Sequence, residues 1–129
     1  IWLVAMLADA ASVLELRPDL AVLAELSRTL SMTGLTVFGA ASGGSDAIAV
    51  RSFAPAHGIS EDPVCGSGNI CVARYLAKTG ALPAVLPRYA ASQGTALGRD
   101  GHVFVRVEGD TVQVGGHAVT CVDGTVVIA

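Results

Sequence analysis

Charged side chains are scarce in this chain. Eleven acidic and eight basic residues leave a formal net charge of −3 over 129 residues, and Lys78 is the only lysine. The arginines are scattered, so no basic surface is available to a nucleic-acid backbone or an anionic lipid headgroup. We therefore expect neither nucleic acid nor a membrane surface as a partner.

Long apolar runs and paired cysteines are also missing. A membrane span needs about 18 apolar residues in a row, and the apolar start is cut by Asp9 and Glu15. The start lacks the basic lead of a signal peptide, so we expect a cytoplasmic protein. Cys65, Cys71 and Cys121 have no CxxC spacing and form no metal-ligand pattern with the histidines. We expect no metal, and interpret Cys71 and Cys121 as reduced thiols in the core.

Hydrophobic residues, by contrast, are abundant and make up 52% of the chain. This content argues against disorder, and 129 residues are enough to bury a core as one domain, residues 1–129. The chain opens at Ile1, already inside an apolar run. We therefore expect either a piece of something longer or a sequence whose leading residues are missing.

The hydrophobic pattern predicts an α+β fold with six or seven strands, one amphipathic helix and one more hydrophobic helix. The amphipathic helix is expected over 17–30, with Pro18 in its first turn, and the hydrophobic helix over 69–80, stopped by Gly80. Strands are expected at 1–7 (buried on both faces), 35–41, 47–55, 88–94, 102–110, 111–119 and 120–129, with hairpin turns at 42–46, 108–111 and 122–126.

One segment, Glu61–Asn69 (EDPVCGSGN), differs from its apolar surroundings. Pro63 suits the first turn of a helix, and the backbone N–H groups of Gly66–Asn69 would be unpaired there, forming a carboxylate or phosphate cradle. Cys65 would stand at the positive end of the helix dipole, which favours a reactive thiolate. Such a site can remove a proton beside a carboxylate, although these residues alone fit a simple helix cap as well.

Residues around this segment allow several roles. His57 could reach the site but is better interpreted as a surface histidine, and His102 and His117 as structural or exposed. Arg51 could bind an anion or form an ion pair with Glu61 or Asp62. The stretch 93–99, with two glycines, is expected to shape a hairpin close to the helix start.

Four blocks in order resemble the PhzF-like isomerase family, relatives of diaminopimelate epimerase. They are RSFAP (51–55), EDPVCGSGN (61–69), QGTALGR (93–99) and VGGHAV (114–119). The resemblance implies two similar halves, each a mixed or antiparallel sheet wrapped around a central hydrophobic helix, with the active site between them. This chain resembles the C-terminal half only. The family's principal acid/base residue lies in the other half, which implies a complementary N-terminal lobe or a homodimer as partner.

The resemblance also implies roles for single residues. Asp62 and Ser67 match substrate-binding positions, and the amides of 66–68 match a carboxylate cradle. Cys65 stands where many PhzF-like members carry threonine but epimerase and proline-racemase relatives carry a catalytic cysteine. The predicted catalytic residues are therefore Cys65 and Asp62, and the predicted substrate-binding residues are Gly66, Ser67, Gly68 and Asn69.

The sequence thus predicts an isomerase or epimerase half that transfers a proton on a small carboxylate-bearing metabolite, without a cofactor. Epimerisation, double-bond migration and loss of water all begin with the same proton transfer, so the reaction stays open. The competing hypothesis is a non-catalytic module, derived from such an enzyme, that binds a ligand or dimerises through its open cleft face.

Overall fold

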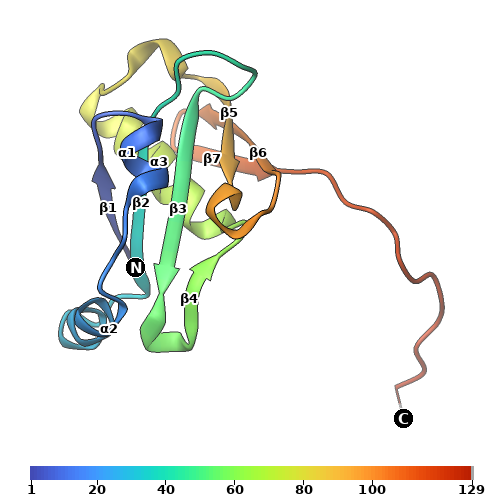
Figure 1. The fold of residues 1–129 in the computed structure, drawn as a ribbon. Helices are drawn as coiled ribbons and strands as arrows, with labels where there is room; N and C mark the ends of the chain where they lie inside the picture. Colours follow the sequence, from blue (N-terminus) through green and yellow to red (C-terminus); the bar gives the residue numbers. More distant parts are fainter. Residues whose placement is uncertain (129) are drawn as a thin grey trace.

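A computed structural model describes residues 1–128 as one mixed sheet with three α-helices (Figure 1). The sheet order is β1 (Trp2–Met6), β2 (Gly34–Ala40), β3 (Ile48–Ala54), β5 (Arg88–Gln93), β6 (Gly101–Glu108) and β7 (Thr111–Gly115), and the short β4 (Ile59–Asp62) pairs with β3. The helices are α1 (Ala10–Glu15), α2 (Leu20–Thr29) and α3 (Gly66–Thr79). The predicted α+β class is confirmed.

The strand directions explain where α3 lies. β1 runs parallel to β2 and β3 parallel to β5, whereas the other neighbouring strands are antiparallel. Two parallel neighbours need a crossover connection, and between β3 and β5 that connection contains α3. α3 contacts β1 and β2 near one end of the sheet and β6 and β7 at the other. The sheet therefore curves around α3, as the resemblance implied.

Two apolar clusters hold the layers together. The larger lies between α3 and the inner face of the sheet and includes Phe38, Ile48, Val72 and Leu76, which are fully buried. The smaller lies on the other face, where α1 and α2 cover β2 and β3. Residue Gly80 adopts a left-handed conformation at φ 69° and ends α3, as predicted.

The two helices on the outer face begin at aspartate caps. Asp19 accepts from the amides of Ala21 and Val22 at 3.0 Å, so α2 starts one residue after Asp19, and Pro18 precedes the cap instead of occupying the first turn. Asp9 accepts from the Ser12 amide at 2.8 Å and starts α1, a six-residue helix that the hydrophobic pattern did not predict. The Asp9 carboxylate thus accepts a hydrogen bond from a backbone N–H group of the first turn that has no partner within the helix.

A buried ion pair joins β3 to β4. Arg51 Nε lies 2.9 Å from Glu61 Oε1 and Nη2 lies 2.7 Å from Oε2, with both side chains more than 90% buried. Arg51 Nη1 also donates to the carbonyls of Val13 and Leu16, at the end of α1. All three guanidinium nitrogens are thereby occupied. Of the two roles that the sequence allowed for Arg51, the structure shows the ion pair.

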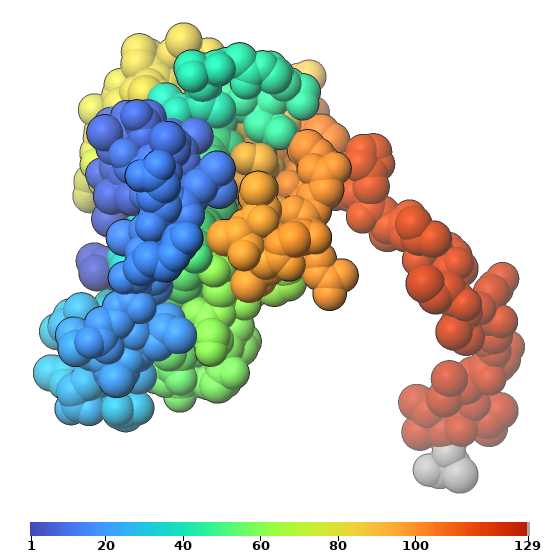
Figure 2. All heavy atoms as spheres, in the orientation of Figure 1, coloured from blue at the N-terminus to red at the C-terminus, as the bar shows by residue number. Residues whose placement is uncertain are grey.

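Two sequence predictions about strands are wrong. Residues 116–128, which we call the C-terminal segment, form no strand and no hairpin, and Cys121 within it is exposed instead of packed. The segment runs away from the body of the domain (Figures 1 and 2). β1 is not buried on both faces, because it is an edge strand with β2 as its only neighbour, and Leu3 and Met6 stay more than 40% exposed. Across the described residues, no helix has the length and apolarity to cross a membrane.

Replacement of Glu61 by alanine is expected to destabilise the fold strongly, because it leaves the Arg51 charge buried without its partner. We expect a loss of about 3–5 kcal/mol in the free energy of unfolding, measured by urea denaturation. The matched control is Glu25→Ala, which breaks the exposed pair with Arg28 and should cost about 0–1 kcal/mol. Equal losses in the two variants would contradict this assignment.

Candidate functional site

The segment 61–69 spans the end of β4 and the start of α3, and Cys65 is the N-cap residue of α3. The Cys65 sulfur accepts a hydrogen bond from the Gly68 amide at 3.3 Å and lies 3.6 Å from the Ser67 hydroxyl. Its side chain is only 3% exposed. The thiol therefore takes the place that a serine or aspartate usually holds at a helix start, at the positive end of the dipole.

The backbone amides of this turn are only partly free. The prediction of unpaired N–H groups is wrong for Gly68, whose amide donates to the Cys65 sulfur, and for Asn69, whose amide donates to the Cys65 carbonyl at 3.1 Å. The amides of Gly66 and Ser67 have no acceptor among residues 1–128. The cradle therefore offers two free donors rather than four.

The side chain of Gln93, at the end of β5, makes hydrogen bonds to this turn. Its side chain is buried, and its Oε1 accepts from the Cys65 amide at 3.1 Å and from Asn69 Nδ2 at 2.8 Å. Gln93 Nε2 donates to the Asp62 carbonyl at 3.0 Å. The sequence placed the Gln93–Gly94 stretch near the helix start, which is confirmed, but the threefold polar role of Gln93 was missed. Its position before a glycine in the third block was the only available signal.

Asn69 belongs to the same buried network. It is fully buried and also donates through Nδ2 to the Cys65 carbonyl at 2.9 Å, while its Oδ1 has no partner in the described part of the chain. Its side chain therefore braces the turn from inside. Its predicted contact with a substrate stays a prediction.

Gly68 brings α3 against the sheet at the closest point. The hydroxyls of Thr36 in β2 and Ser52 in β3, both fully buried, bond each other at 3.0 Å under the helix. A Cβ on residue 68 would lie 2.7 Å from each of these oxygens and 3.2 Å from the Cys65 sulfur. Only glycine fits here without displacing a neighbour. No local sequence pattern linked these two hydroxyls to the turn.

Ser67, Asp62 and Gly66 are the predicted site residues that reach solvent. Ser67 is exposed, and its hydroxyl accepts a hydrogen bond from Trp2 Nε1 in β1 at 3.0 Å. Asp62 is half-buried, and its Oδ1 accepts from the Val64 amide at 3.0 Å, which fixes the turn before α3. The structure brings Ser67 and Cys65 together, with the hydroxyl 3.6 Å from the buried sulfur, whereas the Asp62 carboxylate contacts the Val64 amide and has no described contact with Cys65.

The histidines stand apart from this site. His57 is exposed in a short 3₁₀ turn, and His117 packs edge-on against Phe104. His102 lies between two carboxylates, with Nδ1 3.1 Å from Asp46 and Nε2 3.2 Å from Asp100. The hydrogen bond that the His102 ring donates to the Asp46 carboxylate is the main reason that the pKa of His102 is raised above its ordinary value of 6.5. This pair ties the loop between β2 and β3 to β6.

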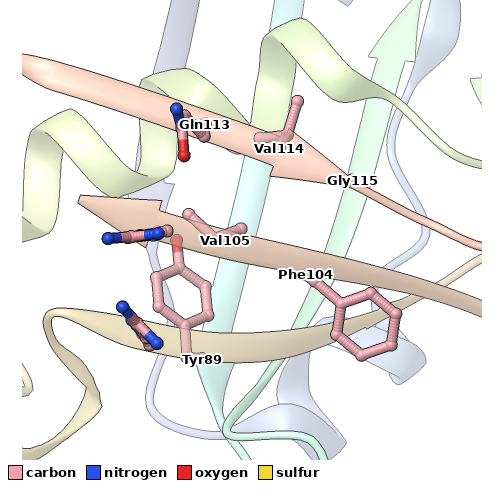
Figure 3. A pocket seen from close by; sticks show the side chains of 8 residues that line it. Tyr89, Phe104, Val105, Gln113, Val114 and Gly115 are labelled. Carbon is pink, nitrogen blue, oxygen red and sulfur yellow. The ribbon is translucent and has the colours of Figure 1, made fainter. Parts of the chain in front are cut away.

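Hollows in the surface lie elsewhere. A groove of about 540 Å³ crosses β5, β6 and β7, lined by Phe104, Val114 and neighbouring side chains (Figure 3). A second, of about 500 Å³, lies beside β4 and the start of α2. Neither is lined by Cys65 or Ser67, so the candidate site rests on the chemistry of its turn and not on a cavity. Residues 1–128 hold no group of three or more metal-binding side chains.

Replacement of Gly68 by alanine is expected to lower the free energy of unfolding by about 1–3 kcal/mol, the usual cost of overpacking. The added methyl group would push Thr36 and Ser52 apart and disturb the cap at Cys65. The control is Gly66→Ala, two residues earlier, where an added Cβ meets only Val114, at 3.8 Å. Urea denaturation of both variants checks this, and a Gly68→Ala protein as stable as the Gly66→Ala protein would contradict the packing argument.

The His102 pair makes the stability depend on pH. Because the pKa of His102 is raised in the folded protein, its contribution is fully present below pH 6.5 and is lost as the pH rises through the raised value. The free energy of unfolding should therefore fall across that window. Replacement of Asp46 by asparagine should flatten the fall, as measured by urea denaturation at a series of pH values. A slope unchanged in Asp46→Asn would contradict this origin.

Comparisons with known proteins extend over nearly the whole chain. The family model described as "Phenazine biosynthesis-like protein" matches residues 1–124. An uncharacterized isomerase of Deinococcus radiodurans is 44% identical over 116 residues, which are 84% of this chain and 37% of the relative. Antisense-enhancing sequence 1 of Schizosaccharomyces pombe is 38% identical over 128 residues, which are 95% of this chain and 42% of the relative.

Solved structures agree with these relatives. A PhzF-family protein of Enterococcus faecalis superposes with a TM-score of 0.71 at 27% identity, over 88% of this chain and 39% of that one. A putative PhzC/PhzF protein from Clostridium difficile gives a TM-score of 0.69 at 26% identity, over 98% of this chain and 45% of that one. The chain thus spans about 40% of the length of these relatives, as a single half-domain. It belongs to the phenazine biosynthesis-like, or PhzF-like, family of isomerases.

Proposed function

We propose that this half-domain supplies one wall of an isomerase site that moves a proton on a small carboxylate-bearing metabolite. The observation that carries the proposal is the turn before α3. There a thiol accepts an amide hydrogen bond at a helix start, beside two free backbone N–H groups and a solvent-facing hydroxyl. A thiolate at this position is favoured by the helix dipole, and free amides at the same helix end attract a carboxylate.

In the proposed chemistry, the substrate carboxylate accepts hydrogen bonds from the amides of Gly66 and Ser67 and from the Ser67 hydroxyl. The Cys65 thiolate takes the proton from the adjacent carbon, and the electron pair of the broken C–H bond moves into the carboxylate. The two amides hold the charge that develops there. A proton then returns to the other face of that carbon or to a different carbon. No metal or organic cofactor is needed for these steps.

Asp62 orients the substrate or relays the proton in this scheme. Its Oδ1 accepts from the Val64 amide, and its second carboxylate oxygen has no described partner and could take this role. Gln93 and Asn69 act as positioning residues, because they fix the backbone of the turn without reaching its outer surface. The group that returns the proton comes from a second lobe or a second copy of the chain, since one half offers a single wall of the cleft.

Exchange of the Cα hydrogen with solvent tests the proposal without knowledge of the product. The chain would be incubated in deuterium oxide with a panel of small α-amino and α-hydroxy carboxylates, and deuterium uptake followed by mass spectrometry. We expect uptake with at least one compound, lost at least ~100-fold in Cys65→Ser, because a hydroxyl is far less acidic than a thiol. The matched control is Cys71→Ser, which removes a half-buried thiol six residues further along the same helix and should leave the rate unchanged.

Alkylation gives a second readout that needs no substrate. Peptide mass analysis across pH 5 to pH 10 reports the reactivity of each cysteine, with exposed Cys121 and half-buried Cys71 as internal references. A poised thiolate requires Cys65 to react with iodoacetamide at lower pH than Cys121 does. Failure of Cys65 to react across the whole range, together with no deuterium uptake, would remove the cysteine base from the proposal.

The second candidate function is a non-catalytic module that binds a carboxylate ligand or dimerises. The observation in its favour is that the Cys65 side chain is only 3% exposed and that neither described groove reaches it. In that case Cys65 is a structural cap, and Ser67 with its neighbouring amides binds an anion. Ligand-dependent shifts of the Gly66 and Ser67 amide resonances without deuterium uptake would favour this candidate.

A further inference from the structure

Trp2 reaches the turn before α3 from β1. Alternate residues of a strand share one face of the sheet, and Val4, two residues after Trp2, packs against the apolar cluster around α3. The Trp2 side chain therefore lies on the face of β1 that is turned toward α3, and its indole Nε1 donates to the Ser67 hydroxyl oxygen at 3.0 Å. Within residues 1–128, the Ser67 hydroxyl has one other side-chain partner, the Cys65 sulfur at 3.6 Å.

The chemistry of the two groups fixes the direction of the bond between Trp2 and Ser67. An indole N–H can only donate, whereas a serine hydroxyl has one proton to donate and two lone pairs that accept. The Ser67 oxygen is therefore the acceptor, and its single proton is not used toward β1. Because the indole holds the oxygen in place, that proton is left for a group other than Trp2.

The Cys65 sulfur is in place to receive the Ser67 proton. It already accepts from the Gly68 amide at 3.3 Å. A neutral thiol and a hydroxyl can each donate to the other, but a thiolate has no proton and can only accept. A hydrogen bond donated to the hydroxyl oxygen polarises the O–H group and strengthens it as a donor. The contact with Trp2 therefore favours the arrangement in which Ser67 donates to a Cys65 thiolate.

We propose that Trp2 is a positioning residue, which holds the Ser67 hydroxyl as a hydrogen-bond donor to the Cys65 thiolate. The chain of contacts runs from the indole N–H to the Ser67 oxygen, and from the Ser67 proton to the sulfur. The thiolate then has two donors, the Ser67 hydroxyl and the Gly68 amide. Hydrogen bonds to the charged form of a group stabilise that form. Trp2 acts only through Ser67 and touches neither the sulfur nor a substrate in this scheme.

This role rests on the proposed function, in which the same Ser67 proton is donated to a substrate carboxylate. A hydroxyl proton turns about its C–O bond, unlike the fixed backbone amides of Gly66 and Ser67. It can therefore pass from the sulfur to an arriving carboxylate while the oxygen stays on the indole. The sulfur then keeps only the Gly68 amide as a donor. Its negative charge is less stabilised, and so more available to take a proton, when the substrate is bound.

Titration of the thiolate in the protein without substrate tests the role of Trp2. Thiolates absorb ultraviolet light more strongly than thiols, so the absorbance difference between each protein and its Cys65→Ser counterpart follows Cys65 alone as the pH is raised. No reagent has to reach the buried sulfur. At a given pH, the ratio of thiolate to thiol should fall about 10-fold in Ser67→Ala. It should fall about 5-fold in Trp2→Phe, which removes the N–H and keeps an aromatic ring.

The double variant separates positioning from an effect on packing. Once Ser67 is alanine, Trp2→Phe should leave the ratio unchanged within about 1.5-fold. The matched control is Leu3→Ala, which truncates an apolar side chain that is 44% exposed on the opposite face of β1 and should have no effect. Because the chain has a single tryptophan, incorporation of an analogue with sulfur in place of the indole N–H changes this one group. That protein keeps the shape of the ring and should match Trp2→Phe.

Three results would overturn the role of Trp2. One is a thiolate ratio that neither Trp2→Phe nor the analogue changes. Another is an effect of Trp2→Phe that persists in Ser67→Ala, which means that Trp2 acts by packing and not through the hydroxyl. The third is a Cys65 that forms no thiolate at any pH at which the protein stays folded. Deuterium uptake separates this role from the proposed function, since the expected thiolate ratios without any uptake would leave Trp2 as a positioning residue and remove the isomerase chemistry.

Discussion

The close approach of α3 to the sheet at Gly68 governs the geometry of everything around it. Gly68 is the third residue of α3, and it lies against the buried hydroxyls of Thr36 and Ser52. The helix cannot shift or rotate without opening that contact. The contact places the first turn of α3 over β2 and β3, and the curved sheet then encloses the rest of the helix from both ends. The apolar cluster along α3 stabilises the enclosure, but it is non-directional and does not by itself set where the helix starts.

Buried polar groups fix the orientation of the turn before α3, which the non-directional packing of the apolar core does not. The Gln93 side chain, at the end of β5, hydrogen-bonds to the backbone of Asp62 and Cys65 and to the side chain of Asn69. These three contacts fix the position of the turn relative to β5. On the other side, Arg51 and Glu61 lock β3 to β4 just before the turn. Buried hydrogen bonds and ion pairs of this kind are costly to leave half-made, which is why they define a single arrangement. The turn before α3 is therefore fixed from its buried side, while Gly66 and Ser67 reach solvent on its outer side.

The exposed groups around the turn before α3 lie close together. Ser67, the free amides of Gly66 and Ser67, and the edge of β1 with Trp2 all lie at one end of the molecule. The relatives covered to about 40% are more than twice as long as this chain, so the same surface in them lies in a protein with additional residues. Membership of the PhzF-like isomerases and the geometry of the turn are consistent with one wall of a two-walled site.

Local sequence signals determined much of this protein. The alternation and helical spacing predicted the α+β class, the long strands and α3 with its glycine stop. The helix start near Cys65 was predicted from Pro63 and the glycines that follow it, although Pro63 was expected in the first turn and lies two residues before the N-cap. Asp9 also caps a helix by local hydrogen bonds, but six residues are too few for a hydrophobic period, so α1 was missed.

Tertiary structure alone decided the rest. Thr36, Ser52 and Gln93 lie 16 to 57 residues apart from one another and come together only because β2, β3 and β5 are neighbours in the sheet. The amides of Gly68 and Asn69 are occupied because the Cys65 side chain and carbonyl turn back on them, which composition does not reveal. The same limit explains residues 120–128. Their β-branched pattern favours a strand, but a strand needs the backbone of a neighbour, and none of the described strands pairs with them.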